Sequence, residues 1–213
     1  KVSTGLLWFG WNSWVWFALL LLVGFACSFV LSRQIGSLSN YLLGLKGERL
    51  VGEMLHWMMK DGFDVFHDFP IEPDGRTGNI DHVLVGPNGV FAIETKAYRK
   101  PKEAPGGKNY EVKFDGKRLE FPHKTTKKGI GQATHNARLL GKHLSASLDL
   151  PVEVTPILAL PGWFVESSSS DPLIVRNPKN IRASILKKPV TIDESLKRKI
   201  SYQLELRCRD IEF

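Results

Sequence analysis

The sequence predicts an α/β protein with a central mixed β-sheet, preceded by one transmembrane helix. Three observations lead to this prediction. A long apolar segment without charged residues lies near the N-terminus. Helical and strand-like patterns then follow one another along the rest of the chain. A Gly-Pro-Asn-Gly turn at residues 86–89 joins two of the strand-like segments into a hairpin.

The N-terminal segment has the composition of a membrane span. It carries no charge from Val2 to Ser32, and its most apolar part is residues 14–31. A helix of that length, extended slightly at either end, crosses a hydrocarbon core of about 30 Å. Tryptophans crowd its N-terminal end, where an interfacial aromatic belt would lie: Trp8, Trp11, Trp14 and Trp16. We therefore expect residues 1–35 to form a transmembrane anchor in contact with the lipid bilayer through residues 14–31.

Basic residues after the span predict its orientation. Arg33 closes the apolar segment, and Lys46 and Arg49 follow soon after it. Under the positive-inside rule, residues 36–213 then lie in the cytoplasm, as the C-terminal domain of a single-pass protein of the inner (cytoplasmic) membrane. The alternative is a cleaved signal peptide on a secreted protein, which the long apolar core and the lack of a basic region beyond Lys1 disfavour.

The next elements follow from hydrophobic periodicity. Residues 42–60 suit an amphipathic helix that ends at Asp61-Gly62, with apolar residues at Leu42, Leu45, Leu50, Met54, Trp57 and Met58. Strands are expected at residues 63–69, 79–85, 89–96, 152–160 and 173–175, and a small hairpin at residues 110–121. Further helices are expected at residues 130–147, 181–186 and 192–206.

The charge balance suits a polyanionic partner. Lys and Arg number 29 against 22 Asp and Glu, a formal net charge of +7. Such a surplus favours nucleic acid or an anionic membrane surface and does not decide between them. The two cysteines, Cys27 and Cys208, form neither a disulfide framework nor a zinc-ligand cluster, as is usual in a reducing compartment.

The hairpin strands carry a group of charges that needs an explanation. In residues 91–96 the odd positions are apolar or β-branched, so the pattern predicts a half-buried strand with Glu94 and Lys96 on its polar face. If the turn is a four-residue loop, Val85 pairs with Val90 and Asp81 lies opposite Glu94. A register slipped by two residues pairs Asp81 with Lys96 instead. In either register Asp81, Glu94 and Lys96 share one face.

Two carboxylates facing each other on a sheet repel, so a cation must offset them. Lys96 supplies one, and a divalent metal would supply another. Hard oxygen ligands favour Mg²⁺ or Mn²⁺, which could polarise a phosphodiester and activate water, with Lys96 stabilising the charge that develops on the phosphate. The alternative is a solvated surface triad without catalytic function.

The motif resembles a known family. Residues 79–85 (NIDHVLV) and 89–96 (GVFAIETK), preceded by Gly47-Glu48 and Gly52-Glu53, resemble the signature of the nuclease-related domain (NERD) family, of the PD-(D/E)xK nuclease superfamily. The resemblance covers residues 46–165 and implies a restriction-endonuclease-like α/β sandwich with a central mixed β-sheet. Residues 36–213 would then be one NERD-like nuclease domain, with a C-terminal helical extension at residues 166–213.

The resemblance also implies roles for individual residues. Asp81 and Glu94 would be metal ligands, joined by the Thr95 backbone carbonyl, and Lys96 would be the catalytic lysine. Glu53 would be the helix-borne acid, with Glu48 as second choice, since the two lie about 140° apart on a helix and only one is expected to face the site. In the helix at residues 130–147, Gln132 resembles the family's glutamine, although the Asn-Pro that commonly precedes it is absent here.

Basic residues flank this motif on both sides. We expect nucleic-acid contacts from Arg99, Lys100, Lys102, Lys124, Lys127, Lys128 and Arg138. Tyr98 could stack on a base, whereas His82 must point to the other sheet face and is interpreted as a packed core histidine. A second basic run, at residues 187–188 and 197–199, could instead face an anionic leaflet.

The function expected from these features is that of a membrane-anchored, Mg²⁺- or Mn²⁺-dependent nuclease that hydrolyses phosphodiester bonds. The resemblance implies DNA rather than RNA, because the superfamily mostly acts on DNA. Membrane attachment would suit action on incoming foreign DNA, as in phage defence. The competing hypothesis is a non-catalytic nucleic-acid-binding or scaffolding module of a membrane-associated protein complex.

Overall fold

The computed structural model describes residues 3–71, 78–167 and 172–209. The chain divides into two compact units, Lys1–Leu43 and Gly44–Phe213. The polar loop expected between residues 71 and 78 falls largely outside the described residues, and so do most of residues 167–170.

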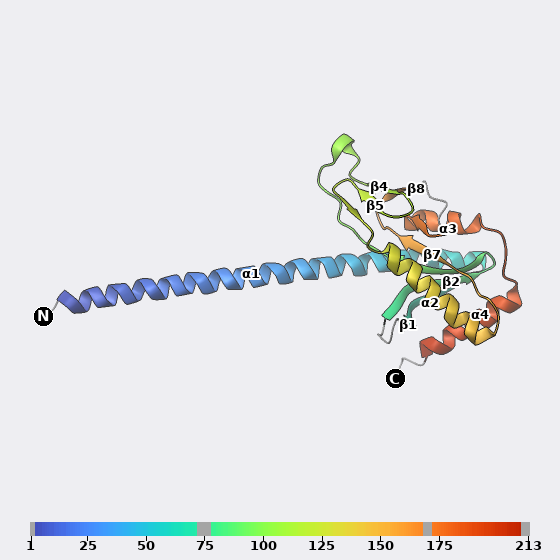
Figure 1. The fold of residues 1–213 in the computed structure, drawn as a ribbon, viewed down its shortest axis with the longest axis horizontal. Coiled ribbons are helices and arrows are strands. Elements are labelled where there is room, and N and C mark those ends of the chain that lie inside the picture. The colour runs from blue at the N-terminus through green and yellow to red at the C-terminus, as the bar shows by residue number, and fades with distance from the viewer. Residues whose placement is uncertain (1–2, 72–77, 168–171, 210–213) are drawn as a thin grey trace. The chain divides into compact units, whose positions relative to one another are not determined.

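The first element is a single long helix, α1 (Ser3–His56), shown in Figure 1. The sequence predicted two helices here, at residues 14–31 and 42–60, and that separation is wrong. Residues 32–41 contain no proline, so no helix breaker separates the two segments. Within α1 an apolar stretch of mean hydropathy 2.4, none of it buried, is long enough to cross a membrane by length and composition.

The second unit is built on a five-stranded sheet. Its strands are β1 (Asp64–Ile71), β2 (Gly78–Gly86), β3 (Gly89–Thr95), β7 (Val154–Ala159) and β9 (Ile174–Arg176), in the order β1-β2-β3-β7-β9. The first three strands pair antiparallel, and β3, β7 and β9 pair parallel. The predicted mixed sheet is therefore confirmed.

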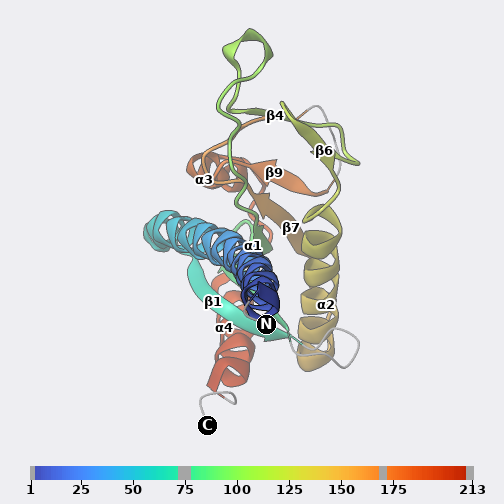
Figure 2. The ribbon, with the colours of Figure 1, turned by 90° about the vertical axis from the view of Figure 1, so that its left-hand side faces the viewer.

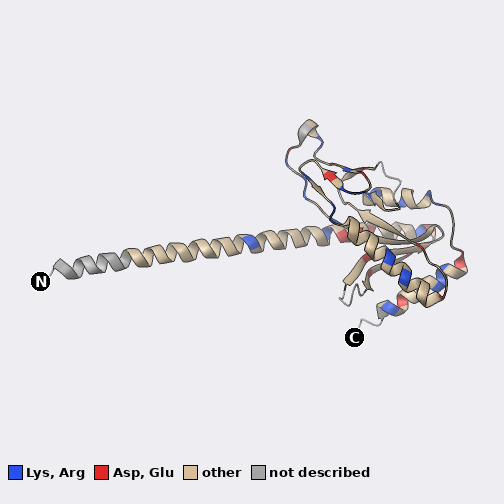
Figure 3. Ribbon diagram, in the orientation of Figure 1, with Lys and Arg blue, Asp and Glu red and all other residues tan. Residues whose placement is uncertain are grey.

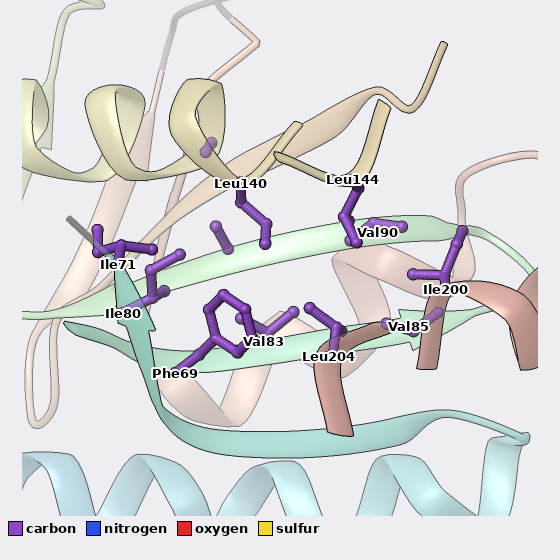
Figure 4. Packing of buried hydrophobic residues seen from close by; sticks show 12 residues of the cluster. Phe69, Ile71, Ile80, Val83, Val85, Val90, Leu140, Leu144, Ile200 and Leu204 are labelled. Carbon is purple, nitrogen blue, oxygen red and sulfur yellow. The ribbon is translucent and has the colours of Figure 1, made fainter. Parts of the chain in front are cut away.

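Helices cover both faces of this sheet. On one face, α2 (Ile130–Leu148) and α4 (Glu194–Arg209) contribute Leu140, Leu144, Ile200 and Leu204 to a core with β1, β2 and β3, as Figure 4 shows. On the other face lie the end of α1, the short helix η1 (Trp57–Asp61) and α3 (Pro178–Leu186). The arrangement is an α/β sandwich of three layers, as the sequence predicted.

Strand β3 is buried on both faces, not on one. Every residue from Val90 to Thr95 is buried, because β3 is the central strand and helices cover both sides of it. The half-buried strand predicted at residues 91–96 is therefore wrong. The polar positions of that pattern lie inside the domain, so Glu94 is a buried carboxylate rather than part of a solvated strand face.

A second sheet lies beside the first. Its strands are β4 (Glu111–Phe114), β5 (Leu119–Phe121), β6 (Lys124–Thr126) and β8 (Phe164–Ser167), in the order β6-β5-β4-β8, and the short helix η3 (Pro105–Gly107) precedes it. Figure 2 labels β4 and β6 of this sheet. Only the β4–β5 hairpin was predicted. The other strands have three or four residues, too few for a periodic pattern to appear. Apolar residues of the sheet, Phe121 of β5 among them, pack with the fully buried Trp163 in one apolar cluster.

The end of α1 faces the sheet with a different side from the one predicted. Its buried residues are Val51 and Leu55, followed by Met58 in η1, whereas Leu42, Leu45 and Trp57 are exposed. Each buried residue follows the previous one by three or four positions, the spacing of a single helix face. The helical segment then ends at Gly62, as predicted, with the left-handed backbone (φ +83°) that favours glycine.

Candidate active site

The site begins where β2 and β3 separate. Their ladder includes Val85↔Val90 and ends at His82↔Ile93, which confirms the predicted register and excludes the register slipped by two residues. Beyond that point β2 continues to pair with β1, and β3 continues to pair with β7. Asp81 and Glu94 are the next residues on the two strands, so both carboxylates lie in the fork between them.

Hydrogen bonds and an ion pair hold the charged groups together in this fork. The Thr95 backbone N–H donates to Oδ2 of Asp81 at 2.6 Å. The Lys96 Nζ lies 2.6 Å from Oε1 of Glu94. The structure therefore brings together Asp81, Glu94, Thr95 and Lys96, all of which the sequence placed in one site.

Glu94 has a second partner that the sequence reasoning missed. The buried Asn136, on α2, donates through Nδ2 to Oε2 of Glu94 at 3.1 Å. A signal for it was present in the sequence. Asn136 lies on the same apolar stripe of an amphipathic helix as Ala133, Ala137 and Leu140. A polar residue in such a stripe needs a hydrogen-bond partner.

Burial raises the pKa of both carboxyl groups. The pKa of Glu94 rises to about 7, first because the group is buried and next because Asp81 repels its charge, while Lys96 opposes the rise. The pKa of Asp81 rises to about 6, mainly by burial, while the Thr95 amide opposes the rise and the charge of Glu48 adds to it. The pair therefore holds its negative charge less readily than ordinary carboxylates and favours any cation that binds beside it.

Of the two helix acids, Glu48, the second choice from the sequence, is the one that influences Asp81 and Glu94. Its charge raises the pKa of both Asp81 and Glu94. Glu53 is mostly exposed and forms an ion pair with Arg49 at 3.1 Å. The sequence contained a signal for this difference between the two acids. Glu48 precedes Val51 by three positions and so lies on the sheet-facing side of α1, whereas Glu53 does not lie on that side.

A pocket of about 360 Å³ between α1 and the sheet adjoins Asp81. Both helix acids reach it, and the residues that line it are Leu45, Glu48, Arg49, Gly52, Glu53, His67, Asp68, Asp81 and His82. His82 is buried, as expected, and its Nδ1 lies 2.8 Å from Nδ1 of His67. Burial, and then the neighbouring His67, lower the pKa of His82 to about 4. His82 is therefore a neutral wall of the pocket.

Gln132, the α2 residue that the sequence placed in the site, does not reach Asp81 or Glu94. It is exposed on the first turn of α2, four residues before Asn136. That spacing places both residues on the same side of the helix. Gln132 therefore lies at the surface above the buried Asn136–Glu94 contact.

Seven exposed cations, which we call the basic rim, lie in segments that adjoin the site. The rim is formed by Arg99, Lys100, Lys102, Lys124, Lys127, Lys128 and Arg138. Tyr98 joins two of these segments, because its hydroxyl donates to the Lys128 carbonyl at 3.2 Å and its ring lies 4.5 Å from the Lys124 ammonium. Figure 3 shows Lys and Arg along the loops of the small sheet and on the outer side of α2. The ring of Tyr98 also packs on Phe121, so it serves to organise the rim.

Small residues bring α2 close to the site. Gly129, at the start of the helix, has a φ of +93°, and a Cβ there would lie 2.9 Å from Cγ of Lys96. Ala133, Ala137 and Gly141 follow at intervals of four on the side that faces the sheet. A Cβ at Gly141 would lie 3.1 Å from the Val152 carbonyl oxygen. This close approach is what allows the short Asn136 side chain to reach Glu94.

We predict that Gly129→Ala destabilises the protein by about 1–3 kcal/mol, because alanine is strained at this φ and its methyl group collides with Lys96. The matched control is Gly131→Ala, two residues further on, where an added Cβ meets nothing within 4 Å. In a helix that change is neutral or stabilises by up to about 1 kcal/mol. Thermal and urea unfolding measure both variants, and equal stabilities for the two would contradict the prediction.

The donor set of the fork fits a hard divalent cation. Mg²⁺ and Mn²⁺ take oxygen ligands and are usually held by one or two carboxylates together with waters. Asp81, Glu94 and the Thr95 carbonyl supply such oxygens, and burial raises the pKa of both carboxyl groups, which a bound cation would lower. Within the described residues, no three His, Cys, Asp or Glu side chains form a ready metal cluster. Lys96 lies beside Oε1 of Glu94, so a bound cation would have to share this carboxylate with the lysine.

Comparison with known proteins shows the family of this chain. The model of the nuclease-related domain family matches residues 43–161. The chain belongs to this family, and the resemblance drawn from its motif is confirmed. An uncharacterized protein of Bacillus anthracis is 38% identical over 56 residues, which make up 26% of this chain and 26% of that protein. The chain thus matches about a quarter of that relative's length.

A crystal structure of a protein of unknown function also aligns with this fold. It shares 12% sequence identity and has a TM-score of 0.36, over 80% of this chain and 89% of that one.

Proposed function

We propose that this protein is a metal-dependent nuclease of the PD-(D/E)xK type that hydrolyses phosphodiester bonds of DNA. The observation that carries the proposal is the fork between β2 and β3, where buried Glu94, Asp81 and Lys96 meet. Membership of the nuclease-related domain family supports the same reading. Two carboxylates with raised pKa values beside a lysine form a costly arrangement in a protein interior, and catalysis gives a reason for it.

Each residue of the fork has a role in this proposal. Asp81, Glu94 and the Thr95 carbonyl would hold Mg²⁺ or Mn²⁺. When bound, the cation would polarise the phosphodiester and favour ionisation of water. Lys96 would stabilise the charge that develops on the phosphate. Glu48 would be the helix-borne acid in place of Glu53.

The basic rim would bind the DNA backbone on the side of Lys96, with Gln132 at the surface beside the entering phosphate. Phosphate contacts of this kind release counterions, so they make binding depend on salt. DNA rather than RNA is proposed only because the superfamily acts mostly on DNA.

We expect Lys100→Ala and Lys127→Ala each to reduce the slope of log affinity against log salt by about 1. Lys199→Ala on α4, which is outside the basic rim, is the matched control and should leave the slope unchanged. Fluorescence anisotropy with labelled duplex DNA, in chelator and over a range of salt concentrations, measures the slope. A slope that changes equally in all three variants would contradict the assignment of the rim.

The apolar part of α1 would anchor the domain in the inner membrane, with the nuclease in the cytoplasm. The helix is able to span a membrane by length and composition, and Arg33 with the basic residues that follow suits a cytoplasmic side. Such a nuclease would meet DNA as it enters the cell, which suits action on phage or other foreign DNA. Protease protection of the C-terminal unit in inverted and right-side-out vesicles tests the orientation.

Cleavage by the full chain is the direct test of the proposed function. The protein in detergent micelles is incubated with plasmid, linear and single-stranded DNA and with RNA, with Mg²⁺, with Mn²⁺ or with chelator. We expect cleavage of DNA that stops in chelator. Cleavage that persists in chelator would contradict the proposed mechanism.

A second candidate function is a nucleic-acid-binding or scaffolding module without catalysis. The observation that favours it is the ion pair of Lys96 with Glu94, which satisfies the buried carboxylate without a metal. DNA binding without cleavage under every condition would support this candidate.

A further inference from the structure

We propose that Asn136 is a positioning residue of the site, which holds the Glu94 carboxylate in the orientation that cation binding and Lys96 require. The inference rests on the proposed function and adds to it a residue outside the Asp81, Glu94 and Lys96 motif.

The geometry of Glu94 leads to this assignment. The side chain is 1% exposed, and each of its oxygens lies beside one polar group, Oε1 in an ion pair and Oε2 in a hydrogen bond. Lys96 lies 2.6 Å from Oε1, and Asn136 donates to Oε2 at 3.1 Å. The two partners come from different elements, since Lys96 follows β3 directly and Asn136 belongs to α2. Together they fix the plane of the carboxylate, which one flexible lysine alone would leave free to turn.

Space filling does not explain an asparagine at this position. The residue is 5% exposed and lies on the apolar stripe of α2, where an apolar side chain would fill space without a polar group that needs a partner. A buried amide is costly unless it forms hydrogen bonds, and here Nδ2 donates to a carboxylate. The close approach of α2 at Gly129 and Gly141 brings this short side chain within reach of Glu94.

The expected effect follows from how such partners act in metal sites. Groups that hydrogen-bond a metal ligand orient it, and their loss typically weakens metal binding by about 10–100-fold. Asn136 is buried on the sheet-facing side of α2, so we expect no contact between it and DNA. Its loss should therefore reduce cation affinity and kcat, and leave KM for DNA and DNA affinity in chelator unchanged.

The test uses the full chain in detergent micelles with the variant Asn136→Leu, which keeps the branching at Cγ and the number of side-chain heavy atoms and removes the donor. Titration with Mn²⁺, followed by the electron paramagnetic resonance signal of the free ion, should show affinity about 10–100-fold below wild type. Asn136→Ser, whose hydroxyl is too short to replace the contact, should show a loss in the same range. Thr134→Leu, an exposed change on the same helix, is the control and should bind Mn²⁺ as wild type does.

Each outcome decides the matter. Mn²⁺ affinity within twofold of wild type in a folded Asn136→Leu or Asn136→Ser variant would overturn the inference, and so would a wild-type protein that binds no Mn²⁺. Failure of both variants to fold would also overturn it, because the amide would then serve the fold. If wild type binds Mn²⁺ more tightly than the variants but cleaves no DNA, the proposed function fails while the positioning role of Asn136 stands.

Discussion

Replacing Lys96 with methionine is expected to reduce DNA cleavage by about 10²–10³-fold, the usual loss when a charge-stabilising group leaves an active site. Methionine keeps the apolar stem that packs near Gly129 and removes the ammonium beside Glu94. Asp81→Asn should reduce cleavage at least as much, because an amide is a poor ligand for a divalent cation. Cleavage rates with Mg²⁺, measured on linear and plasmid DNA, check both variants.

DNA binding separates a catalytic loss from a folding defect. Both variants should bind duplex DNA in chelator with nearly wild-type affinity, because the basic rim is unchanged. Lys199→Met, which removes an exposed lysine from α4, is the matched control and should cleave DNA at the wild-type rate. Cleavage by Lys96→Met at a rate within threefold of wild type would show that the lysine has no part in the chemistry.

Glu94→Gln is expected to stabilise the metal-free protein by about 3 kcal/mol at pH 8 and to change nothing near pH 4. The pKa of Glu94 is about 7 in the folded protein, against an ordinary value of 4.5. Below pH 4.5 the carboxyl group is protonated in both states. As the pH rises from 4.5 to 7 the unfolded chain ionises first, so folding loses stability. The loss is complete above pH 7 and amounts to about 1.4 kcal/mol for each unit of pKa difference.

Urea unfolding in chelator, from pH 4 to pH 8.5, measures this effect. Glu153→Gln changes an exposed acid outside the site and serves as the control, which should follow the wild-type pH dependence. Saturating Mn²⁺ should reverse the order at pH 8, because a ligand that binds only the folded state stabilises it and the Glu94→Gln variant provides a weaker site. The lowered pKa of His82 raises stability with pH over part of this range in both proteins, so the difference between wild type and Glu94→Gln is the quantity to compare. A difference that does not grow between pH 5 and pH 8 in chelator would contradict the raised pKa of Glu94.

Much of the fold could be read from the sequence because its signals are local. The Gly86–Gly89 turn set the register of β2 and β3, and the apolar periods located α2 and β7. In the second sheet β6 and β8 escaped prediction because strands of three or four residues are too short to show a periodic pattern. The alternating pattern of residues 91–96 led to the wrong prediction of a half-buried strand, because burial of the second face depends on the rest of the domain. Alternation shows which side chains share a face, whereas the number of helices that cover the sheet is a property of the whole domain.

The candidate site was predicted as far as strand geometry reaches. A period of two and a tight turn suffice to place Asp81, Glu94 and Lys96 together. Residues on helices depend on which helix face meets the sheet, and that face was misjudged for α1. The partly exposed Glu48 lies on the same side of α1 as the buried Val51 and Leu55, so we prefer it to Glu53 as the helix-borne acid. Asn136 was not predicted because the role of a single polar residue in an apolar stripe can be inferred only when its hydrogen-bond partner is known.

Asp81 also completes the hydrogen bonding of the sheet where β2 and β3 part. Its carboxylate accepts the Thr95 N–H at a point where the ladder between the two strands has already ended. An asparagine has a carbonyl oxygen in the same place and can accept the same bond, whereas an alanine cannot. A single change at position 81 could therefore silence the chemistry and preserve the architecture. In evolutionary terms, a DNA-cutting member of this family and a DNA-holding descendant of it would be neighbours, one substitution apart.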